Sequence, residues 1–477
     1  MSLQSVVPLE AQEQEPTKPI GTALAEFATG TAHDAIPEAV RHRALHHMLD
    51  AAGIALASTR FDFAHKTLTA MRGLGGAGDV PVFGMPASLS PRDAAIVNGF
   101  LIHGLDYDDT HIAGVLHPTA SVLPAVLSAA AHAGASGRAM VTAYIVGLEA
   151  AVRLGAVPKG GFHQVGFHPT GLVGVFGCTL AAGRILGLTV KQLEQAQGLA
   201  LSLASGSLEF LEDGAWNKRF HPGWAASAGL TAAALAREGF VGASAPYDGR
   251  FGLYNAYLGP LAEQCDLSLA TEGLGEAWEL LNTAIKPFPT CHFTHGCIDA
   301  ALALLDQIDD PREIVSVEAL VPEEVIKTVC EPEAKKKRPA NDYDAKFSVH
   351  YLIAAALMRG RLGLAELEEE ALRDPQILAL TDKVSYRTDP GSAFPKAYSG
   401  EVSIRLQDGR TLSHREHVNR GAADRPLSND EILAKFRANA AMTVDGEGAE
   451  RMIGAALGLE AAPNGVAAFR VFSPGAA

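Results

Sequence analysis

Apolar residues recur every three to four positions through most of the first 265 residues, which predicts a succession of helices. The stretch IPEAVRHRALHHMLDAAGIALAS has the pattern of one buried helix face. Its apolar positions at this spacing are Val40, Ala44, Leu45, Met48, Leu49 and Ala52. The same reasoning predicts helices over residues 90–105, 118–133, 139–154, 170–186, 189–206 and 223–238. No segment in this part alternates as a β-strand does.

Two of these helices also carry start signals. Ser90 precedes Pro91, which suits the first helical position because proline needs no hydrogen-bond partner there. Thr189 and Gln192 have the spacing of a capping box, in which each side chain satisfies the other residue's backbone N–H.

After about residue 268 the pattern changes to short strands among short helices. EIVSVEALVPEEV (313–325) and GEVSIRLQDGRTLSHREHV (400–418) alternate as half-buried strands do, and Asp408-Gly409 supplies a hairpin turn. DKVSYRTD (382–389) is a third predicted strand, and a helix is predicted over 345–360. Helical spacing returns in SNDEILAKFRANA, where Ser428 and Glu431 form another capping box, and persists through AERMIGAALGL.

The predicted fold class is therefore mainly α, a large all-helical domain with an inserted smaller α+β lid domain. Residues 1–268 form the first part of the helical domain, and 1–18 within it are expected to be a loose tail. Residues 269–417 form the lid, and 418–477 complete the helical domain. No repeat of fixed period is present.

Composition narrows the function classes. Of the 477 residues, 48% are hydrophobic and 19% charged, as in a folded globular protein. A net charge of -15 argues against nucleic acid or an anionic membrane as partner. The N-terminus lacks the pattern of a signal peptide, and no uninterrupted apolar run is long enough for a membrane span. Five scattered cysteines are typical of reduced thiols, so we expect a cytoplasmic protein.

The stretch HGLDYDDTHIAGVLHPT gathers three carboxylates and three histidines. If the preceding helix continues through Leu105, Asp106 and Thr110 share one face. His117 then precedes Pro118 at the start of the next helix. Asp106, Thr110 and His117 are expected to line a pocket. The remaining groups are not: Asp108 and Asp109 are interpreted as solvated loop acids, and His111 is also placed outside.

A second His-Pro pair, His168-Pro169, opens another apolar helix in GFHPTGLVGVFG. A helix N-terminus offers free N–H groups and a partial positive charge, so two such openings can seat carboxylates. A histidine beside them could exchange protons near neutral pH. The alternative is that both histidines only cap helices.

Two further stretches carry cations or metal-binding residue types. NKRFHPGW places Lys218 and Arg219 in a predicted Gly-bounded loop, where they could bind anions or be surface charges. IKPFPTCHFTHGC contains Cys291, His295 and Cys297, but without the paired spacing of structural zinc sites, so no metal is predicted. The chain also lacks the dinucleotide, Walker and serine-hydrolase motifs.

Taken together, VNGFLIHGLDYDDTH, GFHPTGLVGVFG, NKRFHPGWAASAG, KPFPTCHFTH and AKFSVHYLIAAAL resemble the MmgE/PrpD family over nearly the whole chain from about Ile20. This family includes 2-methylcitrate dehydratase of the iron-sulfur-free type, cis-aconitate decarboxylase and iminodisuccinate epimerase. The resemblance implies a helical domain with an inserted α+β lid, a homodimer, and chemistry without a cofactor or metal.

The resemblance also implies a set of site residues. The family's pocket would comprise Asp106, Thr110, His117, His168, Lys218 and Tyr351. His103 would support this set, and Lys286 and His295 match a segment near the domain junction. NKRFHPGW departs from the family pattern through Arg219 and a further His-Pro pair, which weakens any transfer of substrate identity.

These activities share proton transfer at a carbon next to a carboxylate, with fixed positive groups stabilising the developing negative charge. We expect His117 and His168 to act as acid and base, and Asp106 to orient an imidazole. Lys218 and Arg219 would hold the substrate's carboxylates, and Tyr351 would donate from the lid.

The expected function is that of a lyase acting on a small di- or tricarboxylate. Dehydration of the 2-methylcitrate type is favoured, decarboxylation comes second and epimerisation third. A non-catalytic protein that binds an anionic metabolite is the alternative from another class.

Overall fold

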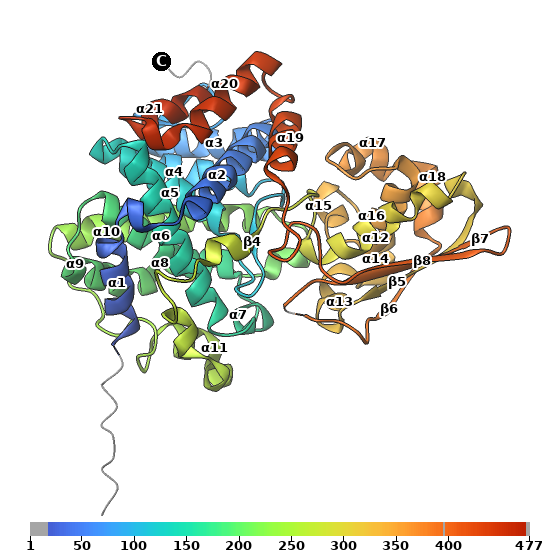
Figure 1. Ribbon diagram of the computed structural model, residues 1–477, viewed down its shortest axis with the longest axis horizontal. Helices are drawn as coiled ribbons and strands as arrows, with labels where there is room; N and C mark the ends of the chain where they lie inside the picture. Colours follow the sequence, from blue (N-terminus) through green and yellow to red (C-terminus); the bar gives the residue numbers. More distant parts are fainter. Residues whose placement is uncertain (1–17, 395, 474–477) are drawn as a thin grey trace, which may run out of the picture.

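Two large hydrophobic cores organise the residues that the computed structural model describes, 18–394 and 396–473. One core belongs to a helical part and the other to a smaller α+β part beside it (Figure 1). The predicted fold class, mainly α with a smaller α+β region, is confirmed. The tail predicted over 1–18 lies outside the described residues except for Lys18.

The helical part is built from both ends of the chain. Its helices are α1 (Ile20–Gly30), α2 (Glu38–Ser58), α3 (Asp62–Gly75), α4 (Pro91–Ile102), α5 (Pro118–Ala133), α6 (Gly137–Ala156), α7 (Gly161–Gln164), α8 (Pro169–Ile185), α9 (Val190–Ala200), α10 (Asn217–Arg237), α11 (Leu253–Leu258), α19 (Asn429–Ala440), α20 (Gly446–Leu457) and α21 (Gly465–Phe469). After the α+β part, α19 and α20 return to pack on α2 (Figure 1).

The α+β part centres on a four-stranded sheet in the order β6-β5-β7-β8. Its strands are β5 (Ile314–Val321), β6 (Val384–Thr388), β7 (Gly400–Leu406) and β8 (Thr411–Glu416), with β6 parallel to β5 and the other pairs antiparallel. The helices are α12 (His295–Ala303), α13 (Ile326–Val329), α14 (Glu333–Lys337), α15 (Asp342–Ala345), α16 (Val349–Arg359), α17 (Glu369–Leu372) and α18 (Pro375–Thr381). Helices α12 and α16 pack on the sheet.

The boundary between the two cores lies close to Thr283. Ala270 and Leu280 still pack in the helical core, beyond the predicted boundary at 268, whereas Ala284 is the first residue after them in the α+β core. Strand β4 (Thr283–Ala284) pairs with β3 (Thr110–His111). This two-residue pair and the pair β1 (Val80–Pro81) with β2 (Ser88–Leu89) were not predicted, because strands so short show no alternation.

Local sequence signals explain several element boundaries. Both predicted capping boxes are present, at Thr189 and Ser428, and Asp408-Gly409 joins the antiparallel strands β7 and β8. The start of α10 was predicted wrongly: the helix begins at Asn217, so the predicted cationic loop is helical, and Pro222 lies inside the helix.

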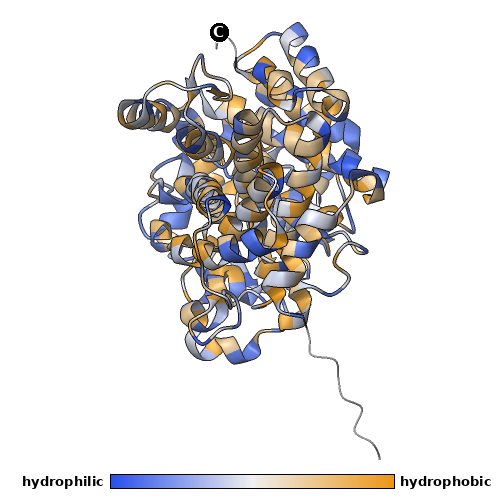
Figure 2. Ribbon diagram, turned by 90° about the vertical axis from the view of Figure 1, so that its left-hand side faces the viewer, coloured by the Kyte–Doolittle hydropathy of each residue, from blue (hydrophilic) through white to orange (hydrophobic). Residues whose placement is uncertain are grey.

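Helix α6 is the one helix within 18–394 and 396–473 that is long and apolar enough to cross a membrane. However, 89% of its most apolar stretch is buried in the protein, as in a core helix. Figure 2, which faces the helical part, shows hydrophobic residues concentrated on the central helices and hydrophilic residues toward the periphery.

Helices α6 and α8 approach each other closely at a pair of glycines. A Cβ atom at Gly177 would lie 2.4 Å from the carbonyl oxygen of Gly147. Since backbone atoms cannot move aside as a flexible side chain can, any larger residue here must push the helices apart.

We therefore expect Gly177→Ala to lower the free energy of unfolding by about 1–3 kcal/mol. The matched control is Gly454→Ala in α20, where nothing lies within 4 Å of the added methyl group. This control should raise stability by roughly 0.5–1 kcal/mol, because alanine favours the helix. Denaturant unfolding measures both, and equal stability of Gly177→Ala and wild type would contradict the packing argument.

Candidate active site

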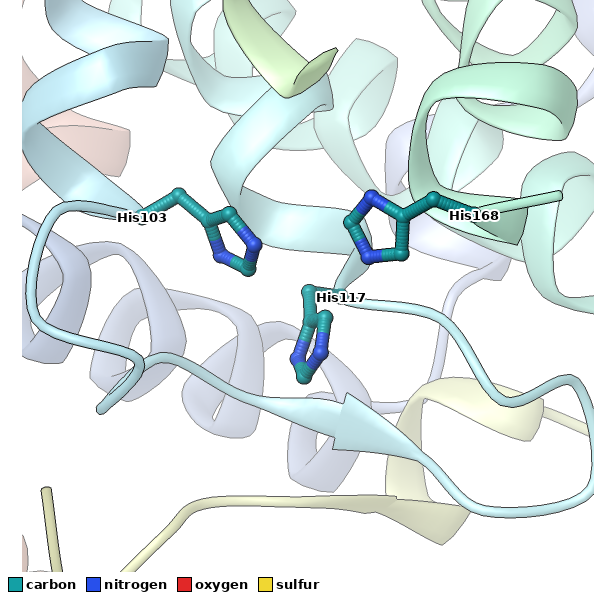
Figure 3. A group of neighbouring side chains, drawn as sticks. All are labelled: His103, His117 and His168. Atoms are coloured by element: carbon teal, nitrogen blue, oxygen red, sulfur yellow. The ribbon is translucent and has the colours of Figure 1, made fainter. Parts of the chain in front are cut away.

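Three histidines converge where three helices of the helical part begin or end (Figure 3). His103 follows the last residue of α4, and His117 and His168 immediately precede Pro118 and Pro169, the first residues of α5 and α8. Neither His117 nor His168 caps its helix with its side chain. The ring centroid of His103 lies 4.8 Å from that of His117 and 5.6 Å from that of His168, and the centroids of His117 and His168 are 6.0 Å apart.

Each of these histidines uses its Nδ1 atom for a hydrogen bond. The partners are Asp108 Oδ2 for His103 at 2.8 Å, the Asp109 carbonyl oxygen for His117 at 2.7 Å, and His221 Nδ1 for His168 at 3.0 Å. Among the described residues, the Nε2 atoms of His103 and His168 are buried without a partner.

These hydrogen bonds limit the positions of the protons. Because a carbonyl oxygen can only accept, His117 Nδ1 must carry a proton, so the neutral ring presents a free electron pair at Nε2. His168 is different: a nitrogen of a neutral imidazole can donate or accept, so its Nε2 can carry a proton toward the cavity. Burial holds the pKa of His103, His117 and His168 well below the ordinary value, with nearby cations adding to the effect, so all three are neutral at pH 7.

Asp106 faces the histidines from a left-handed backbone conformation, with φ of 53°. Its Oδ1 accepts hydrogen bonds from Lys218 Nζ at 2.7 Å and Lys286 Nζ at 3.0 Å. Burial alone would raise the pKa of Asp106, but the two ammonium groups hold it well below its ordinary value. The helix predicted to continue through Leu105 ends at Ile102. The prediction that Asp106 orients an imidazole is wrong, since its carboxylate bonds the two lysines and Asp108 bonds His103.

The chain around Asp106 is held by four buried basic side chains. The carbonyl oxygens of residues 104, 105, 106 and 107 each accept a hydrogen bond from a different side chain. The donors, in that order, are Arg219, Lys346, Lys286 and Lys435, at 2.8, 2.7, 2.9 and 2.9 Å. They come from α10, the link between α15 and α16, the segment after β4, and α19.

A cavity between the two cores brings these groups together. It is lined by Asp106, Thr110, Val115, His117, His163, His168, Leu208, Phe210, Leu211, Lys218, Lys286, Cys291, His292, Phe293, Thr328, Phe347 and Tyr398. Six of the ten residues predicted for the site line it. These six are Asp106, Thr110, His117, His168, Lys218 and Lys286.

Four predicted site residues do not line the cavity. His103 lies behind it, against His117. The Tyr351 hydroxyl donates to the Glu366 carbonyl oxygen within the α+β core, so it cannot donate to a substrate in the cavity as predicted. His295 Nε2 bonds the Thr290 carbonyl oxygen.

Arg219 is the fourth of these residues. Its guanidinium lies 4.3 Å from the ring centroid of Phe63 and 4.7 Å from that of Tyr343, and its Nε donates to the Gly104 carbonyl oxygen. Arg219 therefore joins the helical part to α15 instead of binding substrate.

The acids interpreted as solvated are buried, which corrects that prediction. Asp108 pairs with His103, and Asp109 Oδ2 lies 2.9 Å from His47 Nδ1. His111 is also buried, with Nε2 3.1 Å from Glu279 Oε2. As predicted, none of the three lines the cavity. Asp109 nevertheless contacts a lining residue, because its carbonyl oxygen accepts the hydrogen bond from His117 Nδ1.

Sequence reasoning missed several lining residues. His292 lies in the segment KPFPTCHFTH, in which Lys286 and His295 were predicted as site residues and His292 was not. Its buried Nδ1 atom has no hydrogen-bond partner among the described residues. The Phe347 ring centroid lies 5.2 Å from Lys218 Nζ, and Tyr398 closes the wall from the α+β part. Nothing in the sequence distinguishes these aromatic residues from ordinary core residues.

The three histidines could also hold a metal ion by residue type. Their nearest ligand atoms all lie within 4.8 Å of one another. However, the ammonium groups of Lys218 and Lys286 are among the charges that lower the pKa of both His103 and His117. A divalent cation would be repelled by the same two charges, so the electrostatics favour an anion here.

Two models of one protein family match most of the chain. The MmgE/PrpD N-terminal domain matches residues 22–264, and the MmgE/PrpD C-terminal domain matches residues 288–460. Cis-aconitate decarboxylase of Mus musculus is 28% identical over 456 residues, covering 91% of this chain and 90% of the relative. The Homo sapiens protein of that name is 31% identical over 395 residues, covering 78% of this chain and 77% of the relative. The 2-methylcitrate dehydratase of Escherichia coli K12 is 26% identical over 353 residues, covering 70% of each chain. The chain therefore belongs to the MmgE/PrpD family.

Proposed function

We propose that this protein is a lyase that removes carbon dioxide from a small tricarboxylate of the cis-aconitate type, without a metal ion or cofactor. Dehydration of the 2-methylcitrate type is the second candidate. The relatives named for decarboxylation support this order, because the Mus musculus protein aligns over about nine tenths of both chains and the dehydratase over seven tenths.

The observation that carries the proposal is that the cavity combines fixed charges with a largely apolar lining. Lys218 and Lys286 share the single carboxylate of Asp106, which leaves one net positive charge for an anionic substrate. Much of the remaining wall is apolar, and comprises Val115, Leu208, Phe210, Leu211, Phe293 and Phe347. A carboxylate held against such a wall loses its hydration, and it relieves this cost by leaving as neutral carbon dioxide.

The reaction needs a proton as well as an anion site. When the carbon–carbon bond to the carboxylate on the CH2 group breaks, its electron pair is delocalised through the adjacent double bond, and a carbon of this allylic system must take up a proton. Lys218 and Lys286 stabilise the negative charge while it is delocalised toward a neighbouring carboxylate. His168 supplies the proton, since it is the histidine whose Nε2 can be protonated in the neutral ring, and His117 accepts hydrogen bonds through its free Nε2.

The first test is turnover of cis-aconitate, citrate and 2-methylcitrate in deuterated water, followed by proton NMR. We expect cis-aconitate to be consumed with release of carbon dioxide and with one carbon-bound deuteron in each product molecule. Water loss from 2-methylcitrate alone would support the second candidate. Binding of these acids without any chemical change would contradict both and support a non-catalytic binding protein.

Replacing Lys218 by methionine should lower kcat/KM by roughly 10²-fold, or about 3 kcal/mol, because a fixed charge next to the developing anion is lost. Lys286 still pairs with Asp106 in this variant, so the fold should persist. Lys191→Met is the control, since its side chain is 79% exposed. Wild-type kcat/KM in Lys218→Met would contradict the assigned role.

Removal of metal ions gives an independent test of the chemistry. After dialysis against EDTA, we expect kcat to remain unchanged, because the positive charge in the cavity comes from the lysines. Elemental analysis verifies that the dialysed protein is metal-free. Activity that is lost on dialysis and restored by a divalent cation would mean that the histidine cluster binds a catalytic metal.

A further inference from the structure

His221 does not line the cavity, but it contacts His168, the proposed proton donor, directly. Its Nδ1 lies 3.0 Å from His168 Nδ1. Two Nδ1 atoms at this distance share one hydrogen, so one ring must donate while the other accepts. Phe210 packs edge-on against both rings, with centroids 6.1 Å from each, which fixes their relative orientation.

The other edge of His221 faces away from the cavity. Together with Ser202, Leu203, Ala204, Ser205, Phe220 and Trp224 it lines a separate open groove of about 410 Å³. His221 is only partly buried, whereas His168 is 3% exposed. Among the described residues, no hydrogen bond occupies the Nε2 atom of His221, whose side chain belongs to a residue that lines the groove. The two imidazoles therefore span the wall between the cavity and the surface.

Decarboxylation requires a supply of protons, and the positions of His168 and His221 are suited to provide it. Each turnover consumes one proton, and burial keeps the pKa of the four histidines that line the cavity below its ordinary value, so these rings hold no spare proton at pH 7. A neutral imidazole that simply gave up its Nε2 proton would become an imidazolate, which is far too unstable to form near neutral pH. The difficulty disappears if His168 Nδ1 gains a proton at the same time, because the ring then only changes tautomer.

We propose that His221 relays protons from the outer groove to His168. The proton on His168 Nε2 moves to the substrate carbon as carbon dioxide leaves. The proton on His221 Nδ1 moves to His168 Nδ1, and His221 Nε2 takes a proton from groove water, which is returned to neutrality by buffer. Before the next turnover, once the product has left, water in the cavity protonates His168 Nε2 while the shared hydrogen returns to His221 Nδ1 and His221 Nε2 releases its proton to groove water, which restores the starting tautomers. Both rings begin and end neutral.

The burial of both histidines supports this route. Burial lowers the pKa of His221 to about 4 and holds that of His168 well below its ordinary value, so neither ring stores a positive charge at pH 7. A relay by tautomer exchange needs no charged imidazole in the apolar interior, and it therefore avoids the cost of burying an ion.

Two substitutions separate a relay from a merely structural contact. Asparagine at position 221 can place an amide N–H near the position of Nδ1, so His221→Asn can still orient His168 but cannot pass a proton onward. His221→Ala opens space next to the groove for added imidazole. Phe220→Leu is the matched control, since Phe220 lines the same groove but carries no proton.

We expect both His221 variants to lose kcat by roughly 10²-fold or more, with KM changed by less than about threefold. Imidazole in the buffer should restore part of the kcat of His221→Ala and none of that of His221→Asn. Phe220→Leu should retain wild-type kcat. Thermal melting of each variant verifies that the fold is intact.

Full activity of His221→Asn would overturn the relay and leave only an orienting contact, and wild-type kcat in His221→Ala would remove both roles. The inference rests on the proposed decarboxylation, and the two can fail separately. If the wild-type protein leaves every tested acid unchanged, the proposed function fails. If it releases carbon dioxide but His221 variants do so at the same rate, the relay alone fails.

Discussion

Four buried basic side chains and the backbone carbonyls of residues 104–107 form the interaction on which the site depends. This short segment lies between α4 and β3, and it carries Asp106 in a conformation that is rare for a residue with a side chain. Buried charges of this kind add little net stability, because removing them from water costs about as much as their pairing returns. Their value here is geometric, since each donor fixes one carbonyl and together they fix the direction of the Asp106 carboxylate.

The same burial determines the chemistry of the histidines. In water an imidazole is partly protonated near neutral pH, but in this interior the charged form is too costly, so the rings remain neutral. Positive charge is concentrated instead on Lys218 and Lys286. Fixed positive charge and neutral imidazoles are thus carried by different residue types in one cavity.

Much of the fold could be predicted because it follows from local patterns. The helix predicted over 118–133 is α5 to the residue, and both capping boxes lie where the sequence placed them. The His-Pro pairs located His117 and His168 for the same reason: a histidine directly before a helix-starting proline must sit at the helix N-terminus.

The rest depended on contacts between distant segments. Lys435 reaches the Tyr107 carbonyl oxygen from 328 residues away, and no local pattern reports such a distance. Arg219 resembles a substrate-binding residue in sequence, yet aromatic rings from two different parts of the chain enclose it. Asp108 is a local exception, since its partner His103 is only five residues away, but the irregular loop between them has no periodic pattern from which their contact could be predicted.

The order in which these parts are synthesised has a consequence for assembly. The ribosome makes the segment carrying Asp106 early, its α+β contact at Lys346 much later, and its last donor, Lys435, only in the returning helix α19. A nascent chain can bury most of its first helices long before it can hold this carboxylate in place. The complete set of contacts around Asp106 therefore forms as one of the final events of biosynthesis, and a truncated product lacking α19 would lack the Lys435 contact.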